Sequence, residues 1–272
     1  MSDLSHYLLP EGNVQIAFSG GRTSAYMLHQ ILEANGGLPD RAEVVFTNTG
    51  RERNETLDFV AEVGSRWGVM VTWLEYRPSM PLFEIVGYQG ASRNAEPFEA
   101  LIRRKKALPN QDQRFCTEEL KVKTARRYLV SLGWRKWSKA TGIRADEPKR
   151  HNPKKQPRET IFQPLAAAGV TKHHVIAFWQ QQPFDLRLPI VKGRTVGGNC
   201  RKCMLKSEAD IAAEIRDDAA DDWPDRMEAM TGHTFSKRYS HREMREFLER
   251  QGDFALSTEG FLCQADDGEC MA

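Results

Sequence analysis

Short apolar runs alternate with stretches of helical spacing over the first 74 residues of the chain. The apolar runs are residues 13–18, 42–46 and 69–74, and apolar side chains recur at helical intervals in residues 23–34 and 55–67. Strands and helices that alternate in this way form βαβ units with right-handed crossovers. The pattern therefore predicts an α/β fold, with an open, mostly parallel sheet and helices on both faces.

The rest of the chain is less regular, and residues 83–107 look partly helical and partly loop-like. The other expected elements are a strand at residues 137–141 and helices at residues 118–132, 171–180, 208–230 and 241–251. A glycine-rich segment, residues 187–203, is expected to be a loop that carries two cysteines to the surface. We therefore divide the chain into an α/β domain, residues 1–192, and a cysteine-containing loop with a small helical C-terminal segment, residues 193–272.

The composition is that of a soluble globular protein, because 40% of the 272 residues are hydrophobic and 28% are charged. The N-terminal segment contains Asp3 and Glu11 and lacks the basic start and apolar stretch of a secretory signal. No apolar run is long enough to span a bilayer. We therefore expect a cytoplasmic protein without a membrane partner. Its five cysteines would stay reduced there and serve a metal, a cluster or redox chemistry in preference to disulfides.

Positive charge is concentrated in the middle of the chain. Residues 101–158 contain 18 Lys and Arg against 5 Asp and Glu, although the whole chain has a net charge of only +2. A basic segment of this kind suits a polyanionic partner, either nucleic acid or a nucleotide with several phosphates. Solvated helix faces explain the same charges equally well.

A glycine turn follows the first expected strand. Residues 18–24 read Phe-Ser-Gly-Gly-Arg-Thr-Ser, and ligands of open α/β sheets bind where strands end. Adjacent glycines leave backbone N–H groups unshielded, and the N-terminus of the following helix adds partial positive charge. The hydroxyls of Ser19, Thr23 and Ser24 add donors. The turn is thus a candidate phosphate site, with an ordinary strand-to-helix turn as the alternative.

This turn resembles the PP-loop of the adenine nucleotide α-hydrolase superfamily, which usually reads Ser-Gly-Gly-x-Asp-Ser. Thr23 stands at the position of the Asp. Members of the superfamily bind ATP or an adenylyl compound and often cleave between the α and β phosphates.

Four later segments resemble motifs of one branch, the phosphoadenosine phosphosulfate (PAPS) reductase family, and follow its order. Val45–Gly50 with Glu55-Thr56 resembles the Asp-Thr-Gly…Glu-Thr motif, with Asn48 in place of the Asp. Thr141–Glu147 resembles the Gly-x-Arg loop, and Phe162–Pro183 resembles the Pro-Leu…Trp-Thr…Asp-Val pattern. Gly197–Cys203 resembles the Gly-Cys-x-x-Cys turn. The resemblance covers roughly residues 13–206.

The resemblance implies where an adenine nucleotide binds. The adenine ring would lie at the ends of the first two strands, the phosphates with Mg²⁺ on the glycine turn, and Arg144 near the phosphate or sulfate end, where its planar fork suits oxyanions. The nucleotide-binding residues so implied are Ser19, Gly20, Gly21, Arg22, Thr23, Ser24, Asn48, Thr49, Gly50, Gly142 and Arg144.

The spacing Cys200-x-x-Cys203 lets two thiolates meet one metal or cluster, although a redox dithiol has the same spacing. The segment around Cys116 resembles the cysteine segment of cluster-bearing adenylylsulfate reductases, which begins with two adjacent cysteines and here has one. The resemblance implies three ligands of a 4Fe-4S cluster, Cys116, Cys200 and Cys203. Zinc is the alternative.

The fourth ligand is expected in the C-terminal tail. We favour Cys263, because Phe261 and Leu262 can anchor it, over Cys270, which lies two residues from the terminus. Glu269-Cys270 resembles the tail that bears the nucleophilic cysteine of PAPS reductases, so Cys270 is a weak catalytic candidate. An ordinary terminal thiol is the preferred interpretation.

Together these resemblances imply a PP-loop enzyme that acts in sulfur transfer or nucleotide activation. Nucleic acid is one candidate acceptor, and a sulfur donor or reductant protein is a candidate partner. Reduction of an adenylylated sulfate is an alternative that the incomplete Glu-Cys tail argues against. A non-catalytic module that binds a nucleotide or nucleic acid is a second alternative, because Thr23 and Asn48 stand where carboxylates are expected.

Overall fold

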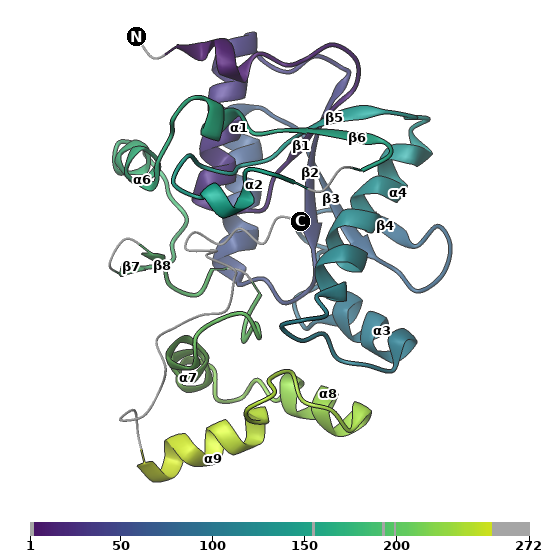
Figure 1. The fold of residues 1–272 in the computed structure, drawn as a ribbon, viewed down its shortest axis with the longest axis vertical. Helices are drawn as coiled ribbons and strands as arrows, with labels where there is room; N and C mark the ends of the chain where they lie inside the picture. The colour runs from purple at the N-terminus through teal and green to yellow at the C-terminus, as the bar shows by residue number, and fades with distance from the viewer. Residues whose placement is uncertain (1–2, 154–155, 192–193, 199, 252–272) are drawn as a thin grey trace.

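The computed structural model describes residues 3–153, 156–191, 194–198 and 200–251 (Figure 1). One six-stranded sheet has the strand order β4-β3-β2-β1-β5-β6, and every neighbouring pair is parallel except β3 with β4. Its strands are β1 (Val14–Ala17), β2 (Ala42–Asn48), β3 (Val71–Tyr76), β4 (Phe83–Val86), β5 (Trp137–Ala140) and β6 (Glu159–Phe162). The prediction of an open, mostly parallel α/β sheet is confirmed.

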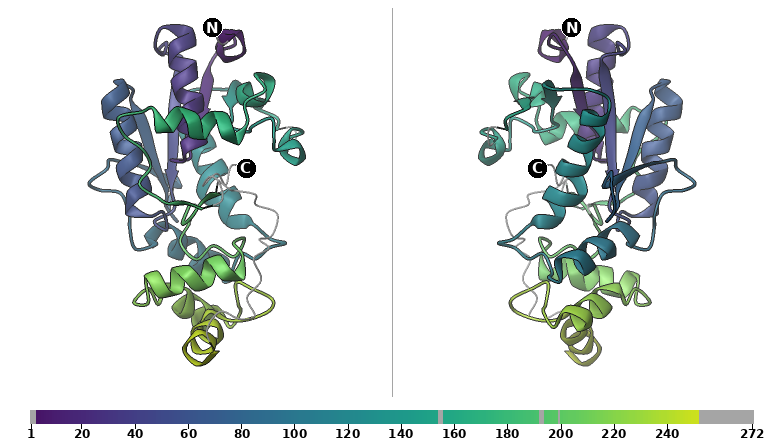
Figure 2. Two further views of the ribbon diagram at one scale, coloured as in Figure 1. Left: turned by 90° about the vertical axis from the view of Figure 1, so that its left-hand side faces the viewer. Right: turned by 90° about the vertical axis from the view of Figure 1, so that its right-hand side faces the viewer.

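Helices cover both faces of this sheet (Figure 2). One face packs against α1 (Arg22–Asn35), α2 (Asn54–Trp67) and α6 (Lys172–Gln180), and the other packs against α4 (Thr124–Ser131). The remaining helices of the α/β part are α3 (Glu96–Lys105), α5 (Pro164–Ala167), a π-helix (Thr117–Lys123) and two 3₁₀ helices (Leu4–Tyr7 and Pro148–Arg150). Within the described part of the chain, no helix is both long and apolar enough to cross a membrane.

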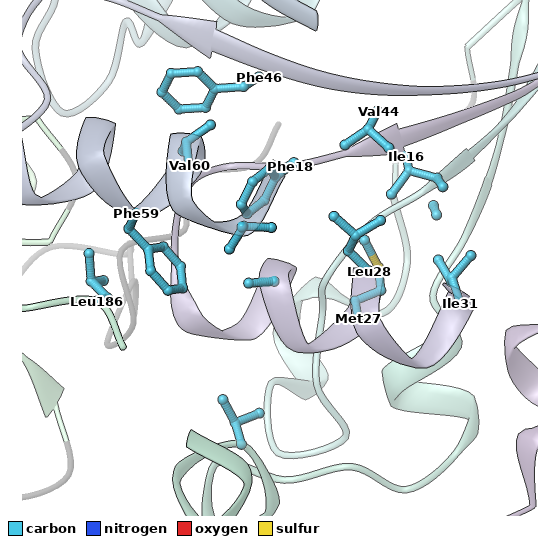
Figure 3. Close-up of a cluster of buried hydrophobic side chains, with 14 of the residues drawn as sticks. Ile16, Phe18, Met27, Leu28, Ile31, Val44, Phe46, Phe59, Val60 and Leu186 are labelled. Carbon is cyan, nitrogen blue, oxygen red and sulfur yellow. The ribbon is translucent and has the colours of Figure 1, made fainter. Parts of the chain in front are cut away.

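The main core lies between the sheet and the helices α1 and α2 (Figure 3). Ile16 of β1 and Val44 of β2 pack with Met27, Leu28 and Ile31 of α1, and none of the five is more than 1% exposed. Burial of each such side chain stabilises the fold by about 1.5–3 kcal/mol. This packing fixes β1 against α1, and so fixes the turn that joins them.

Gly20 lies in that turn and has a φ of +80°. A Cβ at this position would lie 2.8 Å from Cγ2 of Thr56 and 2.9 Å from Cγ2 of Val60, both on α2. Any side chain would therefore strain the backbone and collide with α2. Glycine at this position lets the turn lie directly against α2.

Two strands of the sheet are not anticipated by the sequence pattern. β4 lies in the segment expected to be partly helical, and β6 precedes the Pro-Leu motif. Each has four residues and lies at an edge of the sheet, where most of its side chains stay partly exposed. Such short strands show little hydrophobic alternation. A small antiparallel pair, β7 (Ile190–Val191) and β8 (Arg194–Thr195), also interrupts the expected cysteine loop.

The prediction of a single helix at residues 208–230 is wrong, because the structure has two helices there. α7 (Glu208–Asp217) ends before a short turn, and α8 (Trp223–Thr231) begins after it. Pro224 lies in the first turn of α8, where a missing N–H is tolerated, whereas in a helix interior it would break the hydrogen bonding. The break leaves a turn that contains Asp221, whose side chain is 8% exposed.

The C-terminal helices α7, α8 and α9 (His241–Gln251) lie beyond the carboxyl ends of the strands (Figures 1 and 2). Trp223 and Met227 of α8 share a hydrophobic cluster with Phe98 and Leu101 of α3. The described part of this segment therefore packs on α3 and on Tyr76, the last residue of β3.

Candidate functional site

The glycine turn forms a closed set of hydrogen bonds between β1 and α1. The hydroxyl of Ser24 accepts from the backbone N–H of Ser19 at 3.2 Å and donates to the carbonyl of Gly21 at 3.1 Å. The hydroxyls of Ser19 and Ser24 lie 2.9 Å apart. Gly21 is the N-cap residue of α1 and forms no side-chain cap. The first N–H groups of this 14-residue helix therefore open toward the turn, as an anion site requires.

A small cleft opens at this turn, and Ser19, Gly20 and Gly21 line it. Glu52 and Lys121 also line it. We call it the phosphate cleft. It places a buried carboxylate and an ammonium group beside the helix N-terminus, neither of which the sequence motifs single out.

The side chain of Arg22 points away from this cleft to another partner. Its guanidinium forms a two-pronged ion pair with Asp185, with both N–O distances 2.7 Å. It also donates to the carbonyl oxygens of Leu186 and Leu188 and to the hydroxyl of Thr195. The side chain thus fastens Asp185, Leu186, Leu188 and Thr195 onto α1, and Arg22 can serve a phosphate only through its backbone.

Arg144 reaches the helix that follows the glycine turn. Its Nη1 lies 3.4 Å from the hydroxyl of Thr23, and its Nε donates to Asp146 at 2.9 Å. The backbone N–H of Arg144 donates to Glu147 at 3.0 Å. The structure therefore brings the Gly-x-Arg segment to the Thr23 position, although the guanidinium is already held by neighbouring groups. Gly142 is buried in the same segment.

Asn48 is fully buried at the end of β2, and its amide is tied to a carboxylate. The Nδ2 donates to Oε1 of Glu75 at 2.6 Å and to the carbonyl of Ser92 at 2.8 Å, while the Oδ1 accepts from the N–H of Gly50. Glu75 is itself buried and accepts from the N–H and the hydroxyl of Ser92. Asn48 is therefore one of the donors to this buried carboxylate, which also accepts from Ser92 and pairs with Arg77 at 2.9 Å.

Replacing Asn48 with Asp is expected to destabilise the protein by about 1–3 kcal/mol, the usual penalty for an unsatisfied buried polar group. The new carboxylate would replace the donor 2.6 Å from Glu75 and face a like charge. Urea unfolding at neutral pH measures the loss. Lowering the pH should recover part of it, because one shared proton restores a hydrogen bond.

The double variant Asn48→Asp with Glu75→Gln is the matched control, since it restores one donor and one carboxylate to the pair. It should be more stable than the single Asn48→Asp variant. A single variant as stable as the wild type would show that the Asn48–Glu75 contact does not decide the residue at position 48.

The turn after Asn48 connects the phosphate cleft with the cysteines. The N–H and the hydroxyl of Thr49 both donate to Oε2 of Glu52 at 2.8 Å. The other carboxylate oxygen of Glu52 lies 4.0 Å from Sγ of Cys200 and 3.7 Å from Nζ of Lys121. The hydroxyl of Thr49 lies 3.5 Å from the same sulfur. Glu52 is only 4% exposed and stands between the glycine turn and the cysteine turn.

Gly50 has a φ of +77° in this turn. A Cβ would lie 2.9 Å from Cα of Ala95, whose N–H donates to the carbonyl of Gly50 at 2.9 Å. The glycine of the Asn-Thr-Gly motif is thus required by close approach of the chain before α3.

Cys116, Cys200 and Cys203 line one cavity, together with Lys121 and Trp223. The structure therefore brings together the three described cysteines that the sequence groups as ligands. Among the described residues, no three His, Cys, Asp or Glu side chains are already placed to hold a metal ion. Cys263 and Cys270 lie outside the described residues.

Lys121 lies on the π-helix, five residues after Cys116, and lines both the phosphate cleft and the cysteine cavity. π-helical turns are rare and occur frequently at functional sites. The sequence signals for Lys121 and Glu52 were their positions inside the Cys116 segment and the Asn-Thr-Gly segment. Neither position is chemically distinctive without the fold.

A further cleft opens on the α4 face of the sheet, at the ends of β1 and β2. Ala17, Val45 and Thr47 line it, and it shares Ser19 and Lys121 with the phosphate cleft. We call it the base cleft, because the ends of the first two strands are where the sequence resemblance implies an adenine ring.

The basic segment is partly neutralised by its own acids. Lys105, Lys123 and Arg127 lie 3.3, 3.0 and 3.5 Å from the carboxylate of Glu119. Burial raises the pKa of Glu119, but the hydrogen bonds and charges of Lys123 and Lys105 outweigh this and lower it. Residues 103–106 are exposed at the end of α3. Nucleic-acid binding through residues 101–158 remains a prediction.

Comparison with known proteins gives matches at several levels. Residues 13–180 match the family model of the phosphoadenosine phosphosulfate reductase domain. A curated relative, "Uncharacterized nin region protein ORF290" of Escherichia phage lambda, is 32% identical over 212 residues, which are 75% of this chain and 69% of the relative.

Two solved structures are similar to the chain. One is phosphoadenylyl-sulfate (PAPS) reductase from Candida auris in a phosphate complex, with 18% identity, a TM-score of 0.42, and coverage of 62% of this chain and 72% of that chain. The other is the U34-tRNA thiolase NcsA from Methanococcus maripaludis with its 4Fe-4S cluster, with 14% identity, a TM-score of 0.41, and coverage of 89% and 74%.

Proposed function

Because this chain belongs to the phosphoadenosine phosphosulfate reductase family, we propose that it is a PP-loop enzyme that binds ATP or a related adenylyl nucleotide and acts in sulfur transfer or nucleotide activation. The observation that supports this most is the contact between the phosphate cleft and the cysteine cavity. Glu52 lines the first and lies 4.0 Å from Cys200 of the second, and Lys121 lines both. Phosphates bound at the glycine turn would therefore lie beside sulfur.

In this proposal the phosphates bind the N–H groups of residues 20–24, and the base enters the base cleft. Residues 48–50 form the turn between the phosphates and the cysteines. Hydrogen bonds from Asn48 to Glu75, from Thr49 to Glu52 and from Ala95 to Gly50 fix this turn in place. Mg²⁺ usually binds phosphate oxygens together with one or two carboxylates. Glu52 offers a buried carboxylate in the phosphate cleft. This carboxylate could bind the ion, although Thr23 replaces the Asp that would supply a carboxylate in the usual motif.

We further propose that Cys116, Cys200 and Cys203 hold a 4Fe-4S cluster, with Cys263 as the fourth ligand. The donors fit, because three thiols line one cavity and thiolates are the usual ligands of such clusters. Zinc would satisfy the same donors and is the alternative. When bound with four cysteine ligands, the cluster would supply an electron.

Two basic side chains of the protein would then bind the charged groups of the nucleotide. The ammonium of Lys121 would balance phosphate charge at the border of the two cavities, because it lines both. The guanidinium of Arg144 would approach the same end of the nucleotide, because it lies beside the hydroxyl of Thr23 at the start of α1. Both residues would bind and orient charge in a site partly shielded from water, where such interactions are strengthened.

Two other functions are distinguished by experiment. A reductase of adenylylated sulfate would use a nucleophilic cysteine in the tail, where Cys270 is the weak candidate. A non-catalytic module is suggested by Thr23 and Asn48, whose side chains are bonded to Arg144 and Glu75. The first would reduce an adenylylated sulfate, and the second would bind a nucleotide without turnover.

Gly21→Val is expected to reduce ATP affinity at least tenfold while the fold survives. The φ of Gly21 is −96°, which valine adopts readily, so the branched side chain would obstruct the phosphate cleft without straining the turn. Calorimetric titration of ATP with Mg²⁺ measures the change. Gly87→Val is the control, because a Cβ added at the exposed Gly87 would meet no atom within 4 Å. Unchanged affinity in folded Gly21→Val would remove the turn from the site.

The reaction is tested by chromatography of ATP incubated with the anaerobic full chain, with and without nucleic acid and a sulfide donor. We expect AMP and pyrophosphate, the products of cleavage between the α and β phosphates. Binding without any product would favour the non-catalytic module. Dependence of the products on added nucleic acid would identify the acceptor class for the basic segment.

A further inference from the structure

One continuous helix spans residues 115–131 and changes its hydrogen-bond register in the middle. Residues 117–123 are π-helical, and α-helical residues lie directly before and after them. A π-helical turn joins residues five apart, whereas an α-helical turn joins residues four apart. The π turn therefore sets the two ends of this helix at an angle to each other that an uninterrupted α-helix would not give.

Thr124 closes the π turn with two hydrogen bonds. Its backbone N–H donates to the carbonyl of Lys121, three residues earlier. Its hydroxyl donates to the carbonyl of Glu119, five residues earlier, at 2.8 Å. The side chain thus supplies a bond across the five-residue spacing of a π turn. Thr124 is 0% exposed, so solvent is not at hand to replace the hydroxyl if it is removed.

The π turn decides which side chains share one side of the helix. Cys116 and Lys121 are five residues apart and both line the cysteine cavity. In an uninterrupted α-helix, residues five apart point in directions that differ by about 140°. In a π turn, residues five apart are hydrogen-bonded neighbours and lie nearly above one another. The register of this turn therefore brings the cysteine to the side of the lysine, which also lines the phosphate cleft.

We propose that Thr124 is a positioning residue, which holds the π turn and thereby keeps Cys116 on the same side of the helix as Lys121. This role rests on the proposed function, in which Cys116 binds the cluster and Lys121 balances phosphate charge. Without the hydroxyl, the helix relaxes toward an α register. Ala125 and Leu129 are buried in the core and hold the C-terminal half in place. The rotation therefore falls on the N-terminal half and turns Cys116 out of the cavity.

The test measures how fast iodoacetamide modifies Cys116 relative to Cys203 in the same full-length chain, after a chelator has removed any metal. Mass spectrometry of the two peptides gives the ratio of the rates. Thr124→Val removes the hydroxyl and keeps the shape of the side chain. Loss of this bond shifts the balance between the two registers by a factor of about ten, and the ratio should rise by a comparable factor. Thr124→Ser retains the hydroxyl and should retain the wild-type ratio.

Thr231→Val is the matched control for the loss of such a bond. The hydroxyl of Thr231 donates to the carbonyl of Met227 at 2.9 Å, within the regular helix α8. Its removal should leave the ratio of the two cysteine rates unchanged, even where thermal unfolding shows a loss of stability.

Deletion of Glu118 separates positioning from ordinary stabilisation. Glu118 lies in the π turn, and its side chain is 59% exposed. Without it, Cys116 and Lys121 are four residues apart, a spacing that an ordinary α-helix brings to one face. In this shortened chain Thr124→Val should no longer raise the ratio. A hydroxyl that merely stabilised the helix would give no such rescue.

Thermal unfolding checks that each variant folds. A folded Thr124→Val variant with the wild-type ratio would overturn the inference, and so would a raised ratio that persists in the chain without Glu118. If Thr124→Val alone does not fold, the double variant should fold with the wild-type ratio, and its failure would also overturn the inference. A wild type that binds no metal would contradict the proposed cluster, whereas the ratio, measured on metal-free protein, still decides the role of Thr124.

Discussion

Replacing Cys200 or Cys203 with Ser should remove most of the iron from anaerobically purified protein. The wild type should be brown and carry about four irons per chain, as a 4Fe-4S cluster requires. Cys200 and Cys203 reach the cavity from one turn, and Cys116 reaches it from the π-helix, so either serine leaves the cluster with too few thiolates. Iron analysis and the visible absorption of the protein measure the effect.

The tail cysteines supply the matched pair for this experiment. Cys263→Ser should lose iron, and Cys270→Ser should retain it. The opposite result would move the fourth ligand to Cys270. A colourless wild type with one zinc per chain would contradict the cluster, while the three-cysteine cavity would stand as a metal site.

Arg51→Met should destabilise the protein by about 3–5 kcal/mol, the usual loss when one partner of a buried ion pair is removed. Arg51 follows β2, is 1% exposed, and forms two hydrogen bonds with Asp221, at 2.9 and 2.6 Å. Its guanidinium also lies 4.6 Å from the centre of the Trp223 ring. The variant would leave Asp221 buried with Lys202 as its remaining cation, at 3.2 Å.

Urea unfolding measures this loss, and Arg103→Met is the control. Arg103 forms an exposed pair with Glu99 on α3, so its removal should change stability by no more than about 1 kcal/mol. Similar small losses in both variants would show that the Arg51–Asp221 pair does not hold the C-terminal helices.

The same pair predicts how stability depends on pH. Burial raises the pKa of Asp221, but the hydrogen bonds and charge of Arg51, with those of Lys202, outweigh it and hold the pKa well below the ordinary value of 3.8. A carboxyl whose folded pKa is depressed stabilises the fold above its unfolded value and loses that contribution as the pH falls toward the folded value. The wild type should therefore lose stability on acidification below about pH 4 more steeply than Asp221→Asn, provided both start from two-state unfolding.

The first half of the sheet could be predicted because its signals are local. Residues 13–18 and 42–46 are apolar runs beside periodic helices, and they correspond to β1 and β2. β4 escaped prediction because it is a short edge strand paired with β3 in antiparallel register, and nothing in four residues specifies a partner. The break before α8 had a local signal in Pro224, but the acidic helical pattern on both sides obscured it.

The candidate site divides in the same way. The motifs located the glycine turn and the three described cysteines, whose clustering in one cavity agrees with the sequence grouping. Motif position could not show that the Arg22 side chain binds Asp185, 163 residues away. Glu52 was missed because its burial and its neighbours, Thr49 and Cys200, arise only from the packed fold. The motif therefore predicts the backbone conformation of the glycine turn, whereas the charged side chains beside that turn are determined by the tertiary fold.

The five-residue turn at 48–52 also bears on how the chain reaches its folded state. Its residues bond to partners in three later parts of the chain: Glu75 and Ala95, then Cys200 and Arg201, and then Asp221. During synthesis this turn emerges long before its last partners. Until residue 221 is available, the guanidinium of Arg51 has no carboxylate to accompany it into the interior, and the unfavourable burial of a lone charge opposes closure. The α/β part and the described C-terminal helices should therefore fold and unfold together, in a single cooperative transition that requires residue 221 to be present.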